Sequence, residues 1–437
     1  MRDAKQTAIK LVQYLVIGYA LISVLYTIHY FYSTYHQSPP PSSSLNKFTR
    51  SGDATLMASH QEAQAQELAS PPSASSPTHD DAQVTWHGSQ TAMRETFIMS
   101  KIFSDAMQPS QLTPYFYKAR QPIVGSDITM ATLVTKDRFP VLSRLASNYK
   151  GPISAAIHIN DDEERQETMD ALAAVYEANP DFRRYVDVHL VVDTFDRQFN
   201  LWRNVAKLFA RTDYVMMLDV DFHLCTNLQG LREDPDRLAQ LMGSDGRRAL
   251  VVPAFEYVAQ ADGIDYNTFP TTKAQLLEQV NDGKIDMFHK SWLKGHGATD
   301  YDSWYTTNSP YPVVDYDFSY EPYIIYPKQG TPWCDERFIG YGANKAACLF
   351  EIYLSGIEYM VLPDDFLIHQ THKYPENTRR KERQYNRKLY SNFREELCLR
   401  YARMFMAAGE WDSGRADNLK KECAKNRGYR TAMKSII

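Results

Sequence analysis

The most restrictive feature of the sequence is an apolar run near its N-terminus. Residues 11–32 contain no Asp, Glu, Lys or Arg, and at about 1.5 Å per helical residue they are long enough to cross a hydrocarbon core of about 30 Å. Three basic residues precede the run, and the next one is Lys47. Because positive charge favours the cytoplasmic side, we predict a cytosolic tail at 1–10, a transmembrane signal anchor at 11–32 and a lumenal location for the rest.

A cleaved signal peptide is the alternative for this run. Its apolar part is usually about 7–15 residues long and is followed by a cleavage site between small residues. The run here is longer, and no such site follows it. The sequence therefore favours a retained anchor.

The segment after the anchor has a different composition. Residues 37–90 hold eleven Ser and six Pro, with only two aromatic residues. Such a segment cannot bury enough apolar surface to offset its chain entropy, so we predict a disordered stem at 33–90 and a folded domain at 91–437. A short tail, one span, a stem and a large domain are typical of type II Golgi membrane proteins, although a receptor ectodomain would share this layout.

Composition sets limits on the folded part. The 48 Lys and Arg against 53 Asp and Glu give a net charge of −5, which provides no attraction to nucleic acid. With 43% hydrophobic residues the chain can bury a large core. Five cysteines leave at least one unpaired within a single chain. A disulfide at Cys334 or Cys225 would brace the acidic residues that lie near each of them.

Strand and helix patterns alternate along the folded part. Short apolar runs predict strands at 128–134, 153–159, 186–192, 214–218 and 250–253, and amphipathic or acid-started runs predict helices at 161–178 and 200–209. This alternation is typical of an α/β fold with a parallel-centred sheet. Beyond Tyr374 the chain is rich in charge, which predicts surface helices.

Two aspartates follow one of these strands. Asp219 and Asp221 end the apolar run 214–218, and in an extended chain residues two apart point to the same side. Hard oxygen ligands at a strand end suit Mn²⁺ or Mg²⁺ bridging a diphosphate, and open α/β sheets bind ligands beyond the carboxyl ends of their strands. Solvated turn aspartates are the alternative.

A glycine-rich turn forms the second candidate. Asp335 and Glu336 precede Gly340, Tyr341 and Gly342. The glycines permit close approach of a ligand, the tyrosine can stack on a sugar ring, and either acid could act as a general base. Alternatively the acids cap the helix that follows and pair with a nearby arginine.

A histidine pair forms the third candidate for a functional site. His369 ends a short apolar strand, and His372 and Lys373 follow it. A neutral imidazole at position 369 can complete a Mn²⁺ shell begun by two aspartates, and Lys373 can neutralise phosphate. A metal hydrolase that uses His369 and His372 would need a helical H-E-x-x-H context, which is missing here.

Taken in order, these segments resemble glycosyltransferase family 49, which contains the glucuronosyl domain of the LARGE enzymes and β-1,4-glucuronyltransferase. The likeness spans about 128–373. It is carried by Arg203-Asn204-Val205-Ala206, Leu218-Asp219-Val220-Asp221-Phe222, Val252-Pro253-Ala254-Phe255-Glu256, Gly295-His296, Thr299-Asp300-Tyr301, Glu321-Pro322-Tyr323, Asp335-Glu336-Arg337-Phe338, Gly340-Tyr341-Gly342, Asn344-Lys345 and Ile368-His369.

The resemblance implies a GT-A fold (Rossmann-like, with a mostly parallel sheet), a UDP-sugar donor, a glycan or glycoprotein acceptor, Mn²⁺ (with Mg²⁺ as a substitute) and inversion at the anomeric carbon. It places metal ligands at Asp219, Asp221 and His369. The base is expected at Asp335 or Glu336, which lie nearest in sequence, with Asp335 the first choice and Glu256 and Asp300 next in line. By the same resemblance the donor site comprises Thr135, Arg138, Asn200, Arg203, Asn204, Val220 and Lys373. The acceptor site comprises Glu256, His296, Asp300, Gly340, Tyr341, Gly342 and Asn344. Glucuronic acid is the first candidate sugar, and a homodimer stays open.

Some positions depart from the pattern. Certain inverting GT-A galactosyltransferases carry acids just after the glycine turn, where this chain has Asn344 and Lys345. Trp202 and Ala343 also differ from the residues expected there. The alternative to an enzyme is a membrane-tethered lectin or pseudoenzyme, which loss of Asp219 or His369 would have signalled.

Overall fold

The computed structural model describes residues 83–85, 92–94, 111–195, 197–372 and 379–434. The predicted anchor and most of the predicted stem lie outside these residues, so both stay predictions. Within the described part of the chain no helix is both long and apolar enough to cross a membrane. Two short strands, β1 (Gln83–Thr85) and β2 (Ala92–Arg94), pair antiparallel.

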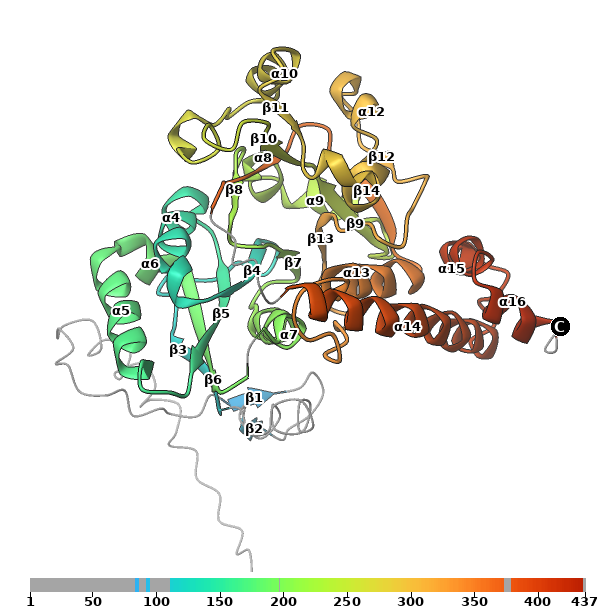
Figure 1. Ribbon diagram of the computed structural model, residues 1–437, viewed down its shortest axis with the longest axis horizontal. Helices are drawn as coiled ribbons and strands as arrows, with labels where there is room; N and C mark the ends of the chain where they lie inside the picture. Colours follow the sequence, from blue (N-terminus) through green and yellow to red (C-terminus); the bar gives the residue numbers. More distant parts are fainter. Residues whose placement is uncertain (1–82, 86–91, 95–110, 196, 373–378, 435–437) are drawn as a thin grey trace, which may run out of the picture. The chain divides into compact units, whose positions relative to one another are not determined.

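A nine-stranded sheet forms the centre of the domain (Figure 1). Four of its eight pairings are parallel and four are antiparallel. The prediction of an α/β fold is confirmed, but the prediction of a mostly parallel sheet is wrong. In sheet order the strands are β12 (Tyr311–Pro312), β14 (Glu358–Val361), β9 (Arg248–Val252), β13 (Tyr323–Pro327), β7 (Tyr214–Met217), β4 (Ile128–Val134), β5 (Ile153–Asn160), β6 (Val186–Asp193) and β3 (Gln111–Tyr117).

Helices cover both faces of the parallel half. Successive side chains of a strand point to opposite faces, so Met130 joins the apolar cluster of Leu142, whereas Ala131 joins that of Trp202 and Val205. The first cluster belongs to the face covered by α4 (Phe139–Tyr149), α5 (Arg165–Ala178) and α6 (Pro180–Tyr185), and the second to the face covered by α7 (Phe199–Phe209) (Figure 1). The amphipathic helix predicted at 200–209 is thus confirmed.

A second sheet continues from the end of β7. Its order is β11 (Ile285–Met287), β10 (Ala254–Tyr257), β15 (Leu367–His369) and β8 (Phe222–Leu224). β15 pairs antiparallel with β8, which places His369 opposite Phe222. The connections hold α8 (Gln229–Arg232), α9 (Pro235–Met242), α10 (Lys273–Asn281), α11 (Leu293–His296) and α12 (Tyr301–Thr306), and the C-terminal part holds α13 (Asn344–Leu354), α14 (Arg379–Ala407), α15 (Asp417–Cys423) and α16 (Arg427–Met433).

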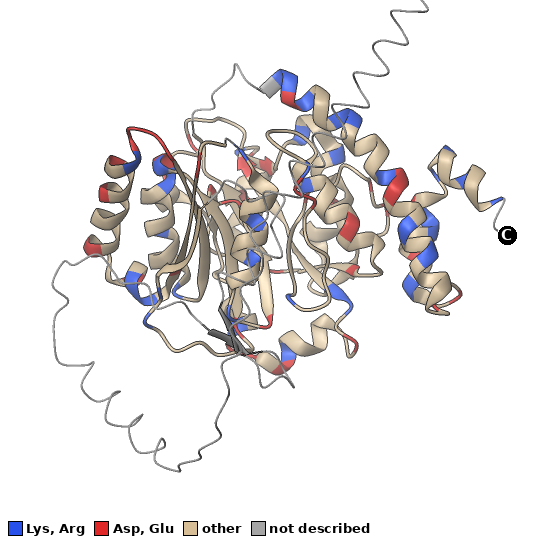
Figure 2. Ribbon diagram, turned by 90° about the horizontal axis from the view of Figure 1, so that it is seen from below, with Lys and Arg blue, Asp and Glu red and all other residues tan. Residues whose placement is uncertain are grey.

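The C-terminal helices carry much of the chain's charge (Figure 2). The prediction of surface helices after Tyr374 is only half right, because one side of α14 is core. Phe393 and Leu397 of α14 are buried in the cluster that also contains Phe350 of α13. A disulfide joins Cys398 of α14 to Cys423 of α15, and a second joins Cys334 to Cys348 of α13.

We expect one free thiol. Cys225 is the unpaired cysteine, and it is buried. Alkylation of the denatured, unreduced protein should therefore label one of the five cysteines, and peptide mapping should locate the label at Cys225. Labelling of Cys334 or Cys348 in a large fraction of molecules would contradict the pairing.

Candidate active site

Acidic and basic side chains meet where two neighbouring parallel strands end. Asp219 and Asp221 follow β7, and the adjacent strand β4 leads into a 3₁₀ turn that ends at Arg138. The Nε atom of Arg138 lies 2.6 Å from Oδ1 of Asp221. The resemblance implied that Arg138 belongs to the donor site, and the structure brings Arg138 and Asp221 together at this sheet edge.

Asp219 is surrounded by positive charge. Its Oδ1 lies 3.4 Å from Nη2 of Arg203, while its Oδ2 lies 3.2 Å from Nζ of Lys345 and accepts a 2.8 Å hydrogen bond from the Tyr323 hydroxyl. Burial raises the pKa of this carboxyl, but Lys345, Arg203 and the hydroxyl outweigh burial and hold the pKa well below its usual range. Asp219 is therefore ionised at neutral pH.

Asp221 points toward a different set of partners. We expected an extended chain from Asp219 to Asp221, but Phe222 N donates to Asp219 O at 3.0 Å and closes a turn there. The expectation of an extended chain is therefore wrong, because a turn takes its place between the two aspartates. Asp221 faces Arg138 and His372, whose Nε2 lies 3.2 Å from its Oδ2.

His369 is held next to Asp221 by the backbone. Gln370 N donates to Asp221 O at 2.9 Å, so the end of β15 lies against the turn after β7. Burial lowers the pKa of His369 to about 4. The imidazole is consequently neutral at physiological pH, which is the form that binds metals.

The predicted metal ligands agree with Mn²⁺ in chemical type. Two carboxylates and a neutral imidazole are donors that suit this ion. Among the residues described, no three Asp, Glu, His or Cys side chains are close enough together to hold a metal ion in this conformation. Basic side chains pair with Asp219 and Asp221 instead. They neutralise the same two carboxylates that a bound metal ion would neutralise.

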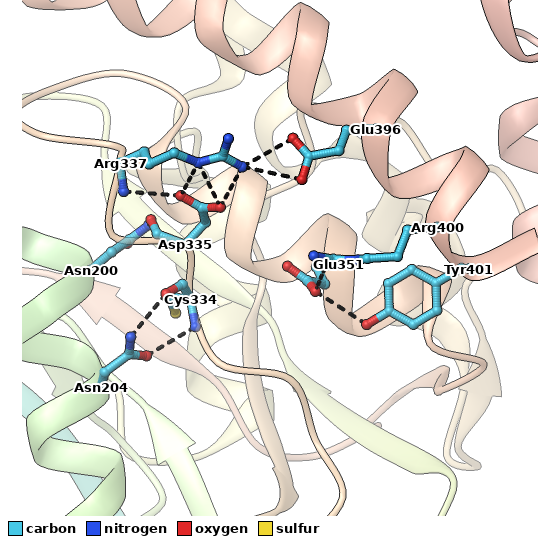
Figure 3. A network of polar contacts seen from close by, with 9 residues as sticks. All are labelled: Asn200, Asn204, Cys334, Asp335, Arg337, Glu351, Glu396, Arg400 and Tyr401. Atoms are coloured by element: carbon cyan, nitrogen blue, oxygen red, sulfur yellow. Dashed lines mark hydrogen bonds and ion pairs between the residues drawn. The ribbon is translucent and has the colours of Figure 1, made fainter. Parts of the chain in front are cut away.

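Helix α7 holds the loop before α13. Nδ2 of Asn200 donates to the carbonyl oxygens of Asp335 (2.8 Å) and Asn344 (3.1 Å). Asn204 donates to Cys334 O at 2.8 Å and accepts from Cys334 N at 2.9 Å (Figure 3). The two asparagines, which we predicted to bind the donor, thus use their amides to fix the backbone that carries the candidate base.

The two candidate bases have different partners. Asp335 accepts hydrogen bonds from the backbone and guanidinium of Arg337, which also pairs with Glu396 of α14 (Figure 3). Glu336 accepts a 2.8 Å hydrogen bond from Asn204. Burial, with a smaller contribution from Asp335, raises the pKa of Glu336 to about 7. A carboxyl with such a pKa can accept a proton near neutral pH, whereas Asp335 is engaged by a cation.

The glycine turn is fixed by α14. Gly340 and Gly342 have φ angles of +78° and +93°, and a Cβ added at Gly342 would lie 3.2 Å from the Cα of Arg383. Tyr341 N donates to Oε2 of Glu382 at 2.9 Å, and the Tyr341 ring packs edge-on against Phe199. The backbone of the turn is therefore approached closely, as its glycines predicted, but the approaching atoms belong to α14 of the same chain.

The remaining predicted residues lie in varied surroundings. Thr135 donates to Asp137, Val220 and His296 are buried, and Glu256 accepts a 2.8 Å hydrogen bond from His289 N. Burial and the charge of Asp286 raise the pKa of Glu256.

Asn344 bridges the glycine turn and Arg203. Its Nδ2 donates to Gly340 O, and its Oδ1 accepts from Arg203. Lys373 lies outside the described residues.

Three site residues had no assigned role in the sequence interpretation. Tyr323 and Lys345 contact Asp219, and the half-buried Glu321 interacts electrostatically with Lys345 and Asp219. All three lie in segments that carry the family resemblance, which was their available signal. Nothing in the local pattern showed that Lys345 is buried.

Comparisons with known proteins show the family of this chain. The family model described as "Glycosyl-transferase for dystroglycan" matches residues 127–199 and 193–402. LARGE2 of Rattus norvegicus, a xylosyl- and glucuronyltransferase, is 36% identical over 256 residues, or 56% of this chain and 34% of the relative. LARGE2s of Danio rerio is 35% identical over 57% of this chain and 32% of the relative. LARGE1 of Homo sapiens is 30% identical over 63% and 36%.

The chain spans about a third of the length of these curated relatives. Among solved structures, a mannosyltransferase from Pyrobaculum calidifontis in complex with GDP-Man and Mn²⁺ matches with a TM-score of 0.34 and 10% identity, over 78% of this chain and 85% of that one. A TM-score this low does not define a shared fold. The family model, however, covers most of the described domain, including Asp219, Asp221 and His369. The chain therefore belongs to glycosyltransferase family 49.

The structure gives Asp300 a role in stability that can be measured. Its Oδ1 accepts a 3.2 Å hydrogen bond from Ser303 N and caps α12. Replacing a capping residue by alanine costs about 1 kcal/mol, so Asp300→Ala should lower the free energy of unfolding by about that amount in chemical denaturation. Asp300→Asn keeps the acceptor and should retain most of it. Equal stability of all three proteins would contradict the cap.

Proposed function

We propose that this chain is a GT-A glycosyltransferase that transfers a sugar from a UDP-sugar to a glycan acceptor with inversion, and that it depends on Mn²⁺. The main observation behind this proposal is that the residues matched by the family model include Asp219, Asp221 and His369 at the strand ends. Of these, Asp219 is ionised and His369 is neutral. Glucuronic acid is the first donor to test, because the relatives are named xylosyl- and glucuronyltransferases.

We further propose a Golgi location, with the domain lumenal and anchored by residues 11–32. The two disulfides support it, because disulfides persist in oxidising compartments and are rare in the cytosol. The apolar, uncharged run at 11–32 and the basic residues before it support the orientation.

The proposed chemistry assigns one task to each group. Asp219, Asp221 and His369 would hold Mn²⁺, which when bound neutralises the diphosphate as it leaves. Arg138, next to Asp221, adds positive charge at the same edge. Glu336 takes the proton of the acceptor hydroxyl, whose oxygen forms the new bond to the anomeric carbon while the bond from that carbon to the diphosphate breaks. Asp335 positions the loop through Arg337.

The donor and the metal are tested together. Purified protein should hydrolyse or transfer from one member of a UDP-sugar panel, and chelation should abolish the turnover. Asp221→Asn removes a ligand charge, so it should weaken the affinity for both Mn²⁺ and UDP in calorimetry. Glycan binding without turnover on any donor would favour the lectin alternative.

The base is tested by pH. A base works only when deprotonated, so kcat/KM should rise with pH through about 7, the pKa of Glu336 in the free enzyme, and level off above it. Glu336→Gln should lower kcat by roughly 10²–10⁴-fold while leaving UDP affinity near that of the parent. Asp335→Asn is the matched comparison and should keep far more turnover. The reverse result, with Asp335→Asn inactive and Glu336→Gln active, would assign the base to Asp335.

A further inference from the structure

A lysine is buried inside the proposed donor site. Lys345 is 5% exposed and is the second residue of α13. Its Nζ lies 3.2 Å from Oδ2 of Asp219 and 3.2 Å from the centroid of the Tyr323 ring. A buried ammonium requires a counter-charge, and Asp219 supplies it directly.

A second carboxylate keeps this lysine in place. Glu321 interacts electrostatically with Lys345, and the backbone of Ala346, in the first turn of α13, also stabilises the charged form of this carboxyl. Glu321 therefore faces the start of the helix that carries the lysine. If Asp219 turned to another cation, Glu321 would still stabilise the ammonium.

The charges of this cluster balance only while the site lacks its ligands. Asp219 and Glu321 supply two negative charges, and Arg203 and Lys345 supply two positive ones. The N-terminus of α13, which has no acid in its first turn, adds partial positive charge. A divalent cation on Asp219 would leave an excess of positive charge, and a diphosphate would restore the balance.

We propose that Lys345 is an exchangeable counter-ion, which pairs with Asp219 when the donor is absent and binds a diphosphate oxygen when a metal ion holds Asp219. This inference rests on the proposed function. Lysine suits the task because its flexible four-carbon stem carries a point charge that can bind phosphate from several directions.

The exchange predicts how metal and nucleotide affect each other. Without nucleotide, Lys345 competes with the metal for Asp219 and weakens metal binding. With nucleotide, the diphosphate takes up the ammonium and the competition ends. UDP should therefore tighten Mn²⁺ binding through Lys345, in addition to direct contact between the two, and coupling factors of this kind are typically 5–150-fold.

The test measures Mn²⁺ affinity on the full chain, by electron paramagnetic resonance of free Mn²⁺, with and without UDP. For Lys345→Met we expect Mn²⁺ alone to bind about tenfold more tightly than to the parent. The factor by which UDP tightens Mn²⁺ binding should fall by about tenfold or more. Lys345→Gln, which keeps a polar side chain, should act in the same direction if the methionine variant folds poorly.

Lys207→Met is the matched control. Lys207 is also buried, but its Nζ donates to the carbonyl oxygens of Thr331 and Pro332 (2.8 and 2.9 Å). None of the hydrogen-bond partners described for Lys207 is a carboxylate. Its loss should leave the Mn²⁺ affinities unchanged. Weaker Mn²⁺ binding by both Lys345 variants, with and without UDP, would show a merely structural role and overturn the inference, as would unchanged affinities. Failure of the parent chain to bind UDP with Mn²⁺ would instead refute the proposed function.

Discussion

The arrangement of the site follows from the need to neutralise one carboxylate. Asp219 lies at the end of a central strand with its side chain only partly exposed (34%), so protein partners compensate much of its charge. Three elements supply its partners: α7 provides Arg203, β13 provides Tyr323, and α13 provides Lys345. The same three elements pack on the sheet around β7, so the position of this charge and the packing of the core constrain each other.

The antiparallel strand β13 is decisive for this arrangement. In a wholly parallel sheet, the strand beside β7 would bring its own C-terminal end to Asp219. Because β13 runs the other way, its first residue, Tyr323, and the preceding Glu321 lie at the C-terminal end of β7. The reversal thus provides the hydroxyl that binds Asp219 and the carboxylate that interacts electrostatically with Lys345 of α13.

Much of the sheet could be predicted from the sequence, because its parallel strands are buried on both faces and read as short apolar runs. The bounds of β4 agree with the prediction residue for residue, and α7 and β7 agree within one residue. β13 is not among the strands that the sequence predicted, and its direction could not be predicted either, since an apolar run of five residues carries no sign of orientation. The position of Asp221 at a strand end followed from the apolar run before it, whereas Arg138 was assigned to the same site by the family resemblance. The different partners of Asp335 and Glu336 could not be predicted from the sequence. Neighbouring side chains point in different directions, and only tertiary contacts show that Glu336 is the one that contacts Asn204.

The glycine turn links the candidate site to the C-terminal helices. Glu382 of α14 accepts hydrogen bonds from Arg197 (2.7 Å) and from Tyr341 N (2.9 Å), and Asn386 donates to the carbonyl of Tyr341 at 3.0 Å. The other end of α14 is tied to α15 through Cys398 and Cys423, while the loop that precedes the turn is tied to α13 through Cys334 and Cys348. The Cys334–Cys348 cross-link therefore braces one side of the loop that carries Glu336, and α14, which holds the glycine turn on the other side, is itself cross-linked to α15.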